Sequence, residues 1–173
     1  MKIRAASESD RERIFQIRNE IIRTSDAILE DEPWTLSKWN HYWEKRETGL
    51  PFLVLVREVE TDSSVNSSVE EVMGYAVIAY FMDRSGYRVT GEISIHLDAS
   101  VRGLGQGSIL LQKIIEAGRS FGFHSLISRI TGTNSASVRM HEKQGFIQVG
   151  HLPRVARKFG NFVDVFFYQK RWE

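Results

Sequence analysis

The sequence predicts an α/β fold in one domain, and three observations lead to this prediction. A glycine-rich turn at residues 103–107 lies between an alternating polar and apolar segment at 91–98 and a run with apolar residues at helical spacing. A segment rich in β-branched residues follows at 125–130, and the order strand, helix, strand favours a parallel pair with a right-handed crossover. The chain has 173 residues, of which 42% are hydrophobic, which suffices for one well-buried core and is little for two. We therefore expect a single domain over residues 1–173.

Before the glycine turn, the sequence indicates a strand, two helices and an antiparallel pair of strands. Ser7 followed by Asp10 is typical of a helix start, and Thr35 can cap a second helix. Two apolar runs on either side of a polar, serine-rich segment indicate neighbouring strands joined by a flexible loop. The expected elements are a strand at 2–6, helices that begin near Ser7 and after Thr35, strands at 52–56 and 72–81, and the flexible loop at 61–71.

The part of the chain from the glycine turn onward indicates two more helices and three strands. Gly145 is expected to end the last helix, because glycine is the usual residue just beyond a helix C-terminus. The expected elements are a helix from Gly107 to about Phe121, a strand at 125–130, a helix at 134–144, and closing strands at 146–149 and 163–172.

Composition limits the classes of partner. The 23 Lys and Arg residues against 22 Asp and Glu give a formal net charge of +1, so the overall charge provides no reason to expect nucleic acid or a membrane as a partner. Any anion site must be local. The chain has no cysteine, which excludes disulfides, thiolate metal sites and a cysteine nucleophile. The charged first residues lack the apolar core of a signal peptide, and no window approaches the ~20 apolar residues of a membrane span, so we expect a cytoplasmic protein.

The glycine turn is a candidate phosphate site. The first N–H groups of the following helix have no partner within the helix, and the helix dipole adds about half a positive charge there. Glycines at 103, 105 and 107 allow the backbone to approach a ligand closely, and Arg102 adds a fixed positive charge. The spacing matches neither the dinucleotide fingerprint nor the P-loop. A glycine-rich connector that binds nothing is the alternative at this point.

The pattern Arg102-x-x-Gly105-x-Gly107 after a strand resembles the coenzyme A pyrophosphate loop of the GNAT acyltransferase superfamily. Further segments are similar to its phosphinothricin N-acetyltransferase branch. They are Glu30-Asp31-Glu32 ahead of Pro33, Gly86-Tyr87-Arg88, Thr90-x-Glu92, Asn134-x-x-Ser137, Met140 through Phe146, and Arg157 through Asp164. The resemblance extends over nearly the whole chain and implies the GNAT fold, a mixed, strongly twisted sheet of about seven strands with helices on both faces. It also implies a splay between strands 4 and 5 that holds the pantetheine arm.

The same resemblance implies acetyl-CoA as the co-substrate and assigns residues to it. Backbone groups of Ile95, His96 and Leu97 would bind the pantetheine, and Asn134 and Ser137 would line the far side of the groove. The pyrophosphate would be bound by Arg102, Gly103, Leu104, Gly105, Gln106, Gly107 and Ser108.

Acetyl transfer to an amine needs a base and a proton for the departing thiolate. Glu92 shares a strand face with Ser94 and His96 and stands where the family places its base, acting directly or through water; a solvent-facing glutamate is the alternative. His141 stands where many GNAT members have a tyrosine and this branch has a histidine. It can accept the amine proton or donate to the thiolate, and a packing histidine is the alternative. His96 itself replaces a residue that is usually tyrosine in the branch. No two histidines have metal-ligand spacing with a carboxylate, so we expect no metal.

The resemblance implies a small amino acid with a second polar or anionic head as the acceptor, such as phosphinothricin, methionine sulfoximine or methionine sulfone. Tyr87, Arg88, Arg157 and Lys158 are the candidates for binding it, because cationic donors bind carboxylates and phosphinates. The alternative for the last two is a solvated basic turn before the final strand. Without a cysteine, direct transfer in a ternary complex is favoured. The branch also implies a homodimer with the acceptor site near the interface.

Two other functions stay open from the sequence. The same fold and co-substrate could serve the acetylation of another amine, such as a protein N-terminus, a polyamine or an aminoglycoside. A non-catalytic acyl-CoA-binding sensor is the third possibility. Glu92 and His141 argue against a sensor, because a protein that only binds the thioester needs no acid–base groups near the sulfur.

Overall fold

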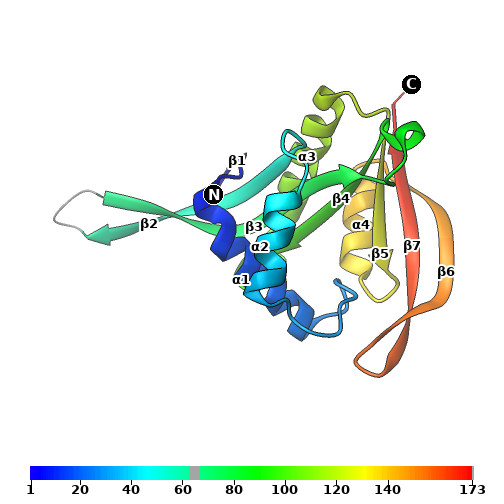
Figure 1. Ribbon diagram of the computed structural model, residues 1–173, viewed down its shortest axis with the longest axis horizontal. Coiled ribbons are helices and arrows are strands. Elements are labelled where there is room, and N and C mark those ends of the chain that lie inside the picture. The colour runs from blue at the N-terminus through cyan, green and yellow to red at the C-terminus, as the bar shows by residue number, and fades with distance from the viewer. Residues whose placement is uncertain (63–66, 173) are drawn as a thin grey trace.

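The computed structural model describes residues 1–62 and 67–172. A seven-stranded sheet in the order β1-β2-β3-β4-β5-β7-β6 crosses the molecule (Figure 1). β4 and β5 are parallel, and the other described neighbours are antiparallel. The strands are β1 (Lys2–Ala5), β2 (Phe52–Asp62), β3 (Ser67–Tyr80), β4 (Thr90–Leu97), β5 (Ser125–Thr131), β6 (Ile147–Lys158) and β7 (Asn161–Arg171), and the helices are α1 (Arg11–Thr24), α2 (Leu36–Lys45), α3 (Gln106–Phe121) and α4 (Ser135–Lys143). The predicted α/β class, strand number and parallel pair are confirmed.

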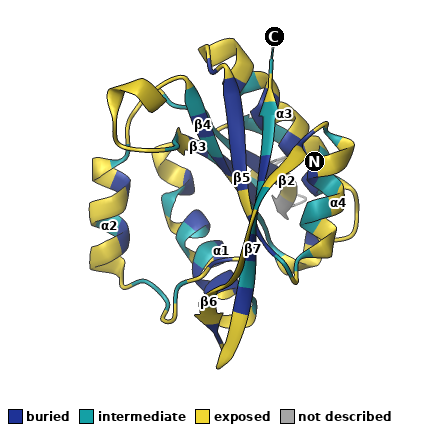
Figure 2. Ribbon diagram, turned by 90° about the vertical axis from the view of Figure 1, so that its right-hand side faces the viewer, coloured by how far each residue is buried: buried dark blue, intermediate teal, exposed yellow. Residues whose placement is uncertain are grey.

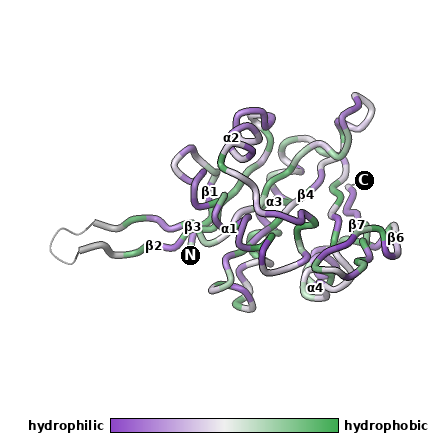
Figure 3. The backbone as a smooth tube through the Cα atoms, turned by 60° about the horizontal axis from the view of Figure 1, so that its bottom comes forward, coloured by the Kyte–Doolittle hydropathy of each residue, from purple (hydrophilic) through white to green (hydrophobic). Residues whose placement is uncertain are grey.

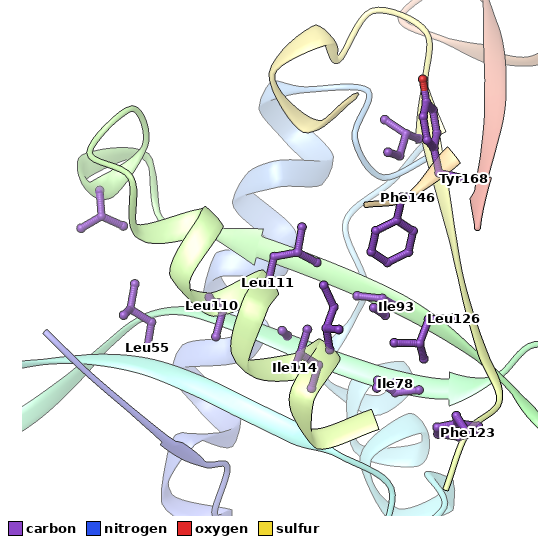
Figure 4. Packing of buried hydrophobic residues seen from close by; sticks show 14 of the residues in the cluster. Leu55, Ile78, Ile93, Leu110, Leu111, Ile114, Phe123, Leu126, Phe146 and Tyr168 are labelled. Atoms are coloured by element: carbon purple, nitrogen blue, oxygen red, sulfur yellow. The ribbon is translucent and has the colours of Figure 1, made fainter. Parts of the chain in front are cut away.

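Helices cover both faces of the sheet, with α1 and α2 on one face and α3 and α4 on the other (Figure 2). Side chains of β2 alternate between the two cores, because successive residues of a strand point to opposite faces. Val54 and Val56 pack with α1 and α2, whereas Leu55 packs with α3. Figure 4 shows the second core, to which α3 contributes Leu110, Leu111 and Ile114. Within the described part of the chain, no helix is both long enough and apolar enough to cross a membrane.

The hairpin of β2 and β3 is longer than predicted. The sequence predicts a flexible loop over 61–71, whereas main-chain pairing continues out to Asp62 and Ser67. The loop prediction is therefore wrong for the paired residues, and residues 63–66 lie outside the described residues. Pairing uses main-chain groups, so a polar sequence does not prevent it. Figures 1 and 3 show this end of the hairpin projecting from the body of the molecule.

β6 is also longer than the predicted strand at 146–149. It runs to Lys158 and turns into β7 at Gly160, which has a φ of 80°. Arg157 and Lys158 therefore lie on a strand and not in a solvated turn. The pairing with β7 shifts in register around Pro153, and this shift interrupts the alternation by which a strand is identified in a sequence.

β4 and β5 diverge after three residue pairs. Thr90–Glu92 pairs with Ser125–Ile127, and β4 then continues alongside β3 to Leu97 while β5 continues alongside β7 to Thr131. From residue 93 onward, the edge of β4 that faces β5 has no strand neighbour among the described residues. The predicted splay is confirmed, and Glu92 lies at the point where the strands part.

Candidate active site

The glycine turn leads from β4 into α3 and leaves main-chain donors free. Gly103 and Gly105 have φ values of 76° and 77°, in the left-handed region that other residues rarely adopt. Gly105 is the N-cap of α3 and offers no side-chain cap. Within the described chain, the N–H groups of residues 103–107 donate to no hydrogen bond. A β-carbon on Gly107 would lie 3.1 Å from Sδ of Met140, so this glycine permits close packing of α3 on α4. The turn therefore presents a row of unused donors.

A groove of about 530 Å³ runs along this turn between β4 and α4, and we call it the loop groove. Arg102 is held beside it, because Nη2 donates to the carbonyl oxygen of Leu97 at 2.9 Å. Leu104 and Gln106 do not line the groove, and the Leu104 side chain is 65% exposed. The other predicted coenzyme residues do line it: Ile95, His96, Leu97, Arg102, Gly103, Gly105, Gly107, Ser108, Asn134 and Ser137.

A second pocket, of about 430 Å³, lies between the diverging strands, and we call it the splay pocket. Glu92 and His141, the two predicted catalytic residues, both line it. Ile95, His96, Asn134 and Ser137 line both the splay pocket and the loop groove. The two hollows therefore adjoin, and the fold brings Glu92 and His141, which lie far apart in the sequence, into one pocket.

The Glu92 side chain is largely buried at the divergence of β4 and β5, with 16% of its surface exposed. Oε1 accepts a hydrogen bond from Nε of Arg129 at 2.5 Å. The Arg129 side chain is 56% exposed, so the ion pair lies at the edge of the pocket, where water weakens it. The contact orients the carboxylate while leaving its second oxygen available to a ligand.

The His141 imidazole is buried and fully hydrogen-bonded. Nδ1 lies 2.8 Å from the carbonyl oxygen of Ser137, and a carbonyl can only accept, so Nδ1 carries the proton. Nε2 then accepts a hydrogen bond from Oγ of Ser128 at 2.8 Å. Burial lowers the pKa of His141, and the bond to the Ser137 carbonyl opposes this only in part. His141 is therefore a neutral imidazole whose Nε2 is an acceptor.

His96 is neutral as well. Burial, together with the positive charges of Arg18 and Arg102, lowers the pKa of His96 to about 3. Its ring packs against Tyr75, with 5.1 Å between the ring centroids. The positive charge in the splay pocket is consequently supplied by arginine and not by histidine.

The sequence analysis did not predict several of the residues that line the splay pocket. Arg18 comes from α1, Glu30 from the segment between α1 and α2, and Ser128 and Arg129 from β5. No spacing rule links these positions, because only the folded sheet brings them together. For Glu30 one signal existed, the acid–proline segment that resembles the phosphinothricin N-acetyltransferase branch.

Tyr87 and Arg88 lie away from the splay pocket of their own chain. Arg88 lines a cavity of about 880 Å³ near the ends of α2 and α3, which we call the distal cavity. Its Nη1 donates to Oε1 of Glu47 at 2.8 Å, and its guanidinium lies 4.1 Å from the ring centroid of Tyr80. Tyr87 packs edge-on against Phe81 and is 42% exposed. The distal cavity and the splay pocket share no described lining residue.

Arg157 and Lys158 also lie outside the described lining of the splay pocket. Lys158 is buried, and its Nζ donates to the carbonyl oxygen of Glu30. This contact ties the β6–β7 hairpin to the segment that carries Glu30. Arg157 Nε donates to the carbonyl oxygen of Gly160 at 3.3 Å. Among residues 1–62 and 67–172, no three histidine, aspartate or glutamate side chains are grouped so that they could hold a metal ion.

Comparison with known proteins identifies the family. The model of the Acetyltransferase (GNAT) family matches residues 13–146, which is more than half of the chain. The chain belongs to the GNAT acetyltransferase family. The L-methionine sulfoximine/L-methionine sulfone acetyltransferase of Pseudomonas aeruginosa is 32% identical over 168 residues, which cover 96% of this chain and 92% of the relative.

Solved structures of GNAT proteins have the same fold. A GNAT superfamily phosphinothricin acetyltransferase from Sinorhizobium meliloti in complex with AcCoA has a TM-score of 0.87 at 27% identity, over 98% of this chain and 87% of that one. A ribosomal-protein-alanine N-acetyltransferase from Brucella melitensis has a TM-score of 0.85 at 32% identity, over 99% of this chain and 100% of that one. The GNAT fold and the acetyltransferase class predicted from the sequence are thus confirmed.

Proposed function

We propose that this GNAT acetyltransferase acts in the cytoplasm as a homodimer and transfers the acetyl group of acetyl-CoA to the amino group of a small amino acid or analogue. Methionine sulfone, methionine sulfoximine and phosphinothricin are the acceptors we propose, in line with what the relatives are named for. One observation carries the proposal. The loop groove with its free N–H groups shares four of the predicted coenzyme residues with the pocket that holds Glu92: Ile95, His96, Asn134 and Ser137.

The loop groove would bind the coenzyme through main-chain groups. Free N–H groups at residues 103–107 suit the oxygens of a pyrophosphate, and the positive end of the α3 dipole adds to their attraction. The edge of β4 without a strand neighbour suits the extended pantetheine arm, which would pair with it as an added strand does. The thioester would then lie near Glu92, at the junction of the two hollows.

Glu92 would act as the base in direct transfer. A free α-amine with a pKa of about 8 is mostly protonated at neutral pH. The Glu92 carboxylate takes this proton and the amine nitrogen attacks the thioester carbonyl carbon. The C–S bond then breaks, and the second proton that the nitrogen loses on becoming an amide ends on the departing thiolate. With no cysteine in the chain, no acetyl-thiol enzyme forms on the way.

His141 would accept a proton and not donate one. A neutral imidazole with the proton on Nδ1 offers the Nε2 lone pair toward Ser128 and has no proton on Nε2 to donate. Accepting a proton there forms an imidazolium, which burial disfavours, so His141 is a weak base. The Ser128 hydroxyl lines the splay pocket and donates to Nε2, so it is the group through which a proton would reach His141. This role is subordinate to that of Glu92, which lies at the divergence itself.

The predicted acceptor contacts of Tyr87 and Arg88 fit a homodimer in which one protomer places this turn at the splay pocket of its partner. The turn is exposed in the single chain, with Val89 54% and Met82 47% exposed. Mixing inactive Glu92→Gln protomers with inactive Arg88→Met protomers should then restore about a quarter of the wild-type turnover, because half of the random dimers contain one intact site. Failure to recover activity in the mixture would contradict this arrangement.

The test of the function is thiol release from acetyl-CoA in the presence of single candidate acceptors. We expect release with L-methionine sulfone, L-methionine sulfoximine and L-phosphinothricin, and little with spermidine, kanamycin or a peptide that begins with alanine. The alanine peptide is included because of the structural similarity to the ribosomal-protein-alanine N-acetyltransferase. A strong preference for the peptide would indicate that the acceptor is a protein N-terminus and not a free amino acid. Binding of acetyl-CoA without any thiol release would favour a non-catalytic acyl-CoA sensor.

A further inference from the structure

Arg18 carries a positive charge with unused donors in the splay pocket. Its side chain is 18% exposed, and Nε is fully buried without a hydrogen-bond partner. The nearest carboxylate oxygen, Oε1 of Glu30, lies 3.9 Å from Nη2, which is too far for a hydrogen bond. The two Nη groups donate to no hydrogen bond among the described residues and, unlike Nε, are not fully buried, so a ligand in the pocket can accept from them.

The position of the guanidinium is fixed by its surroundings. Its Cζ lies 4.0 Å from the ring centroid of Trp34, in a cation–π contact. Asn19, the next residue of α1, holds the Trp34 backbone at both ends: Nδ2 donates to the Trp34 carbonyl at 2.9 Å, and Oδ1 accepts from the Trp34 N–H at 2.8 Å. The helix therefore carries both the cation and the support for the ring beneath it.

The other charges of the pocket have partners. Glu92 is paired with Arg129, and Oε2 of Glu30 accepts from Nζ of Lys38 at 3.1 Å. Burial alone would raise the pKa of Glu30, but the hydrogen bond from Lys38 and the charges of Lys38 and Arg18 hold it below its usual value. Glu30 thus stays ionised and is drawn toward Lys38. Arg18 is thus the cation of this pocket whose Nη groups make no hydrogen bond to a carboxylate of the described chain.

We propose that Arg18 binds the carboxylate of the acceptor amino acid while the amino group faces Glu92. A planar guanidinium and a carboxylate form two parallel charge-assisted hydrogen bonds, which fix orientation as well as affinity. This inference rests on the proposed function and narrows it. The preferred acceptors carry a free carboxylate, which polyamines and aminoglycosides lack and which a protein N-terminus has lost to a peptide bond.

The experiment compares L-methionine sulfone with its α-carboxamide, which differs in this one charge. In the wild type, the carboxylate should have the lower KM. Arg18→Met keeps an unbranched apolar stem and removes the guanidinium. It should raise the KM for methionine sulfone about tenfold or more while changing the KM for the carboxamide less than about threefold. Arg18→Lys should recover part of the loss. The dissociation constant for acetyl-CoA, measured by calorimetry, should not change in either variant.

Arg119→Met, on an exposed position of α3, is the matched control and should leave both KM values unchanged. Melting temperatures show whether each variant folds, and Arg18→Lys carries the test should Arg18→Met not fold. An equal rise in KM for the carboxylate and the carboxamide, or no rise, would overturn the role of Arg18 alone. A wild type that binds acetyl-CoA but acetylates no amino acid would instead overturn the proposed function, and the Arg18 assignment with it.

Discussion

The distal cavity is the larger of the two hollows, whereas the splay pocket holds the candidate catalytic groups. The distal cavity is about twice as large, 880 Å³ against 430 Å³. Its Arg88 already has partners within the protein, because it donates to Glu47 and its guanidinium lies over the ring of Tyr80. The smaller splay pocket holds a carboxylate at a strand divergence, two neutral imidazoles and a guanidinium without hydrogen bonds.

We infer from this difference that volume is a poor guide to the active site and that a cation with donors free to bind a ligand is a better one. Each variant below therefore has a control variant with the same chemical change outside the splay pocket. Some of these controls lie in the distal cavity.

The largest effect is expected for Glu92→Gln, which removes the base without changing the size of the side chain. Turnover should fall about 10²-fold or more, while the affinity for acetyl-CoA stays nearly unchanged. Steady-state thiol release and calorimetry measure the two quantities. Glu116→Gln, at an exposed position of α3, should lower turnover less than about threefold. Equal losses in the two variants would contradict the assignment of the chemistry to the splay pocket.

The next effect concerns stability in acid. The unfolded chain binds a proton at His96 near pH 6.5, whereas the folded chain does so only near pH 3, so the unfolded state gains protons as the pH falls between these values. The free energy of unfolding should drop by about 2 kcal/mol between pH 7 and pH 5 from this residue alone. Urea unfolding at both pH values measures the drop.

His96→Gln should remove this part of the acid sensitivity, and His124→Gln, at an exposed position, should leave it in place. An unchanged slope in His96→Gln would show that the acid sensitivity comes from other groups that bind protons only in the unfolded chain. The distal cavity has no histidine among its described lining residues, so the same acid sensitivity is not expected from it.

A smaller effect is expected for Gly105→Val, which places a branched side chain at a φ of 77° in the glycine turn. The strain and the added bulk should weaken acetyl-CoA binding about tenfold by calorimetry. Gly49→Val makes the same change at a φ of 97° beside the distal cavity, where a β-carbon also has open space. It should cost comparable stability and leave coenzyme affinity intact. Loss of affinity in both variants would point to general unfolding.

The smallest effect is expected for Ser128→Ala, which removes the hydroxyl that donates to Nε2 of His141. The free energy of unfolding should fall by about 1 kcal/mol, because a buried acceptor loses its partner. Turnover should fall less than about tenfold, since Glu92 remains. Ser120→Ala, in the distal cavity, should change neither quantity. A loss of turnover as large as that of Glu92→Gln would instead make His141 the main base.

The fold was predictable from the sequence wherever one local rule decided the outcome. The helix after the glycine turn was expected from Gly107 to about Phe121 and runs from Gln106 to Phe121, because an apolar stripe and a glycine at each end define it. The parallel pair of β4 and β5 followed from the order of the elements. The bounds of β2, β3 and β6 could not be predicted, because main-chain pairing continues through polar and irregular sequence.

The candidate site divides in the same way. Glu92 and His141 were found through motifs and do share one pocket. Arg18 carries no motif, and its role depends on facing β4 across the sheet surface, which no spacing along the chain encodes. Lys158 was predicted to bind substrate because it is basic, yet in the structure it is buried against the main chain of Glu30. The binding of the acceptor by Arg157 and Lys158 stays a prediction.

The pairing of β4 with β5 is short and joins the two halves of the sheet at one end of these strands only. Strands β1 to β4 and strands β5 to β7 are linked directly by three residue pairs. A thioester carrier lodged in the gap would complete this seam, and heat resistance would then rise with its concentration. Molecules without the carrier would therefore melt at a lower temperature than loaded ones, and a thermal-shift titration with acetyl-CoA measures the difference.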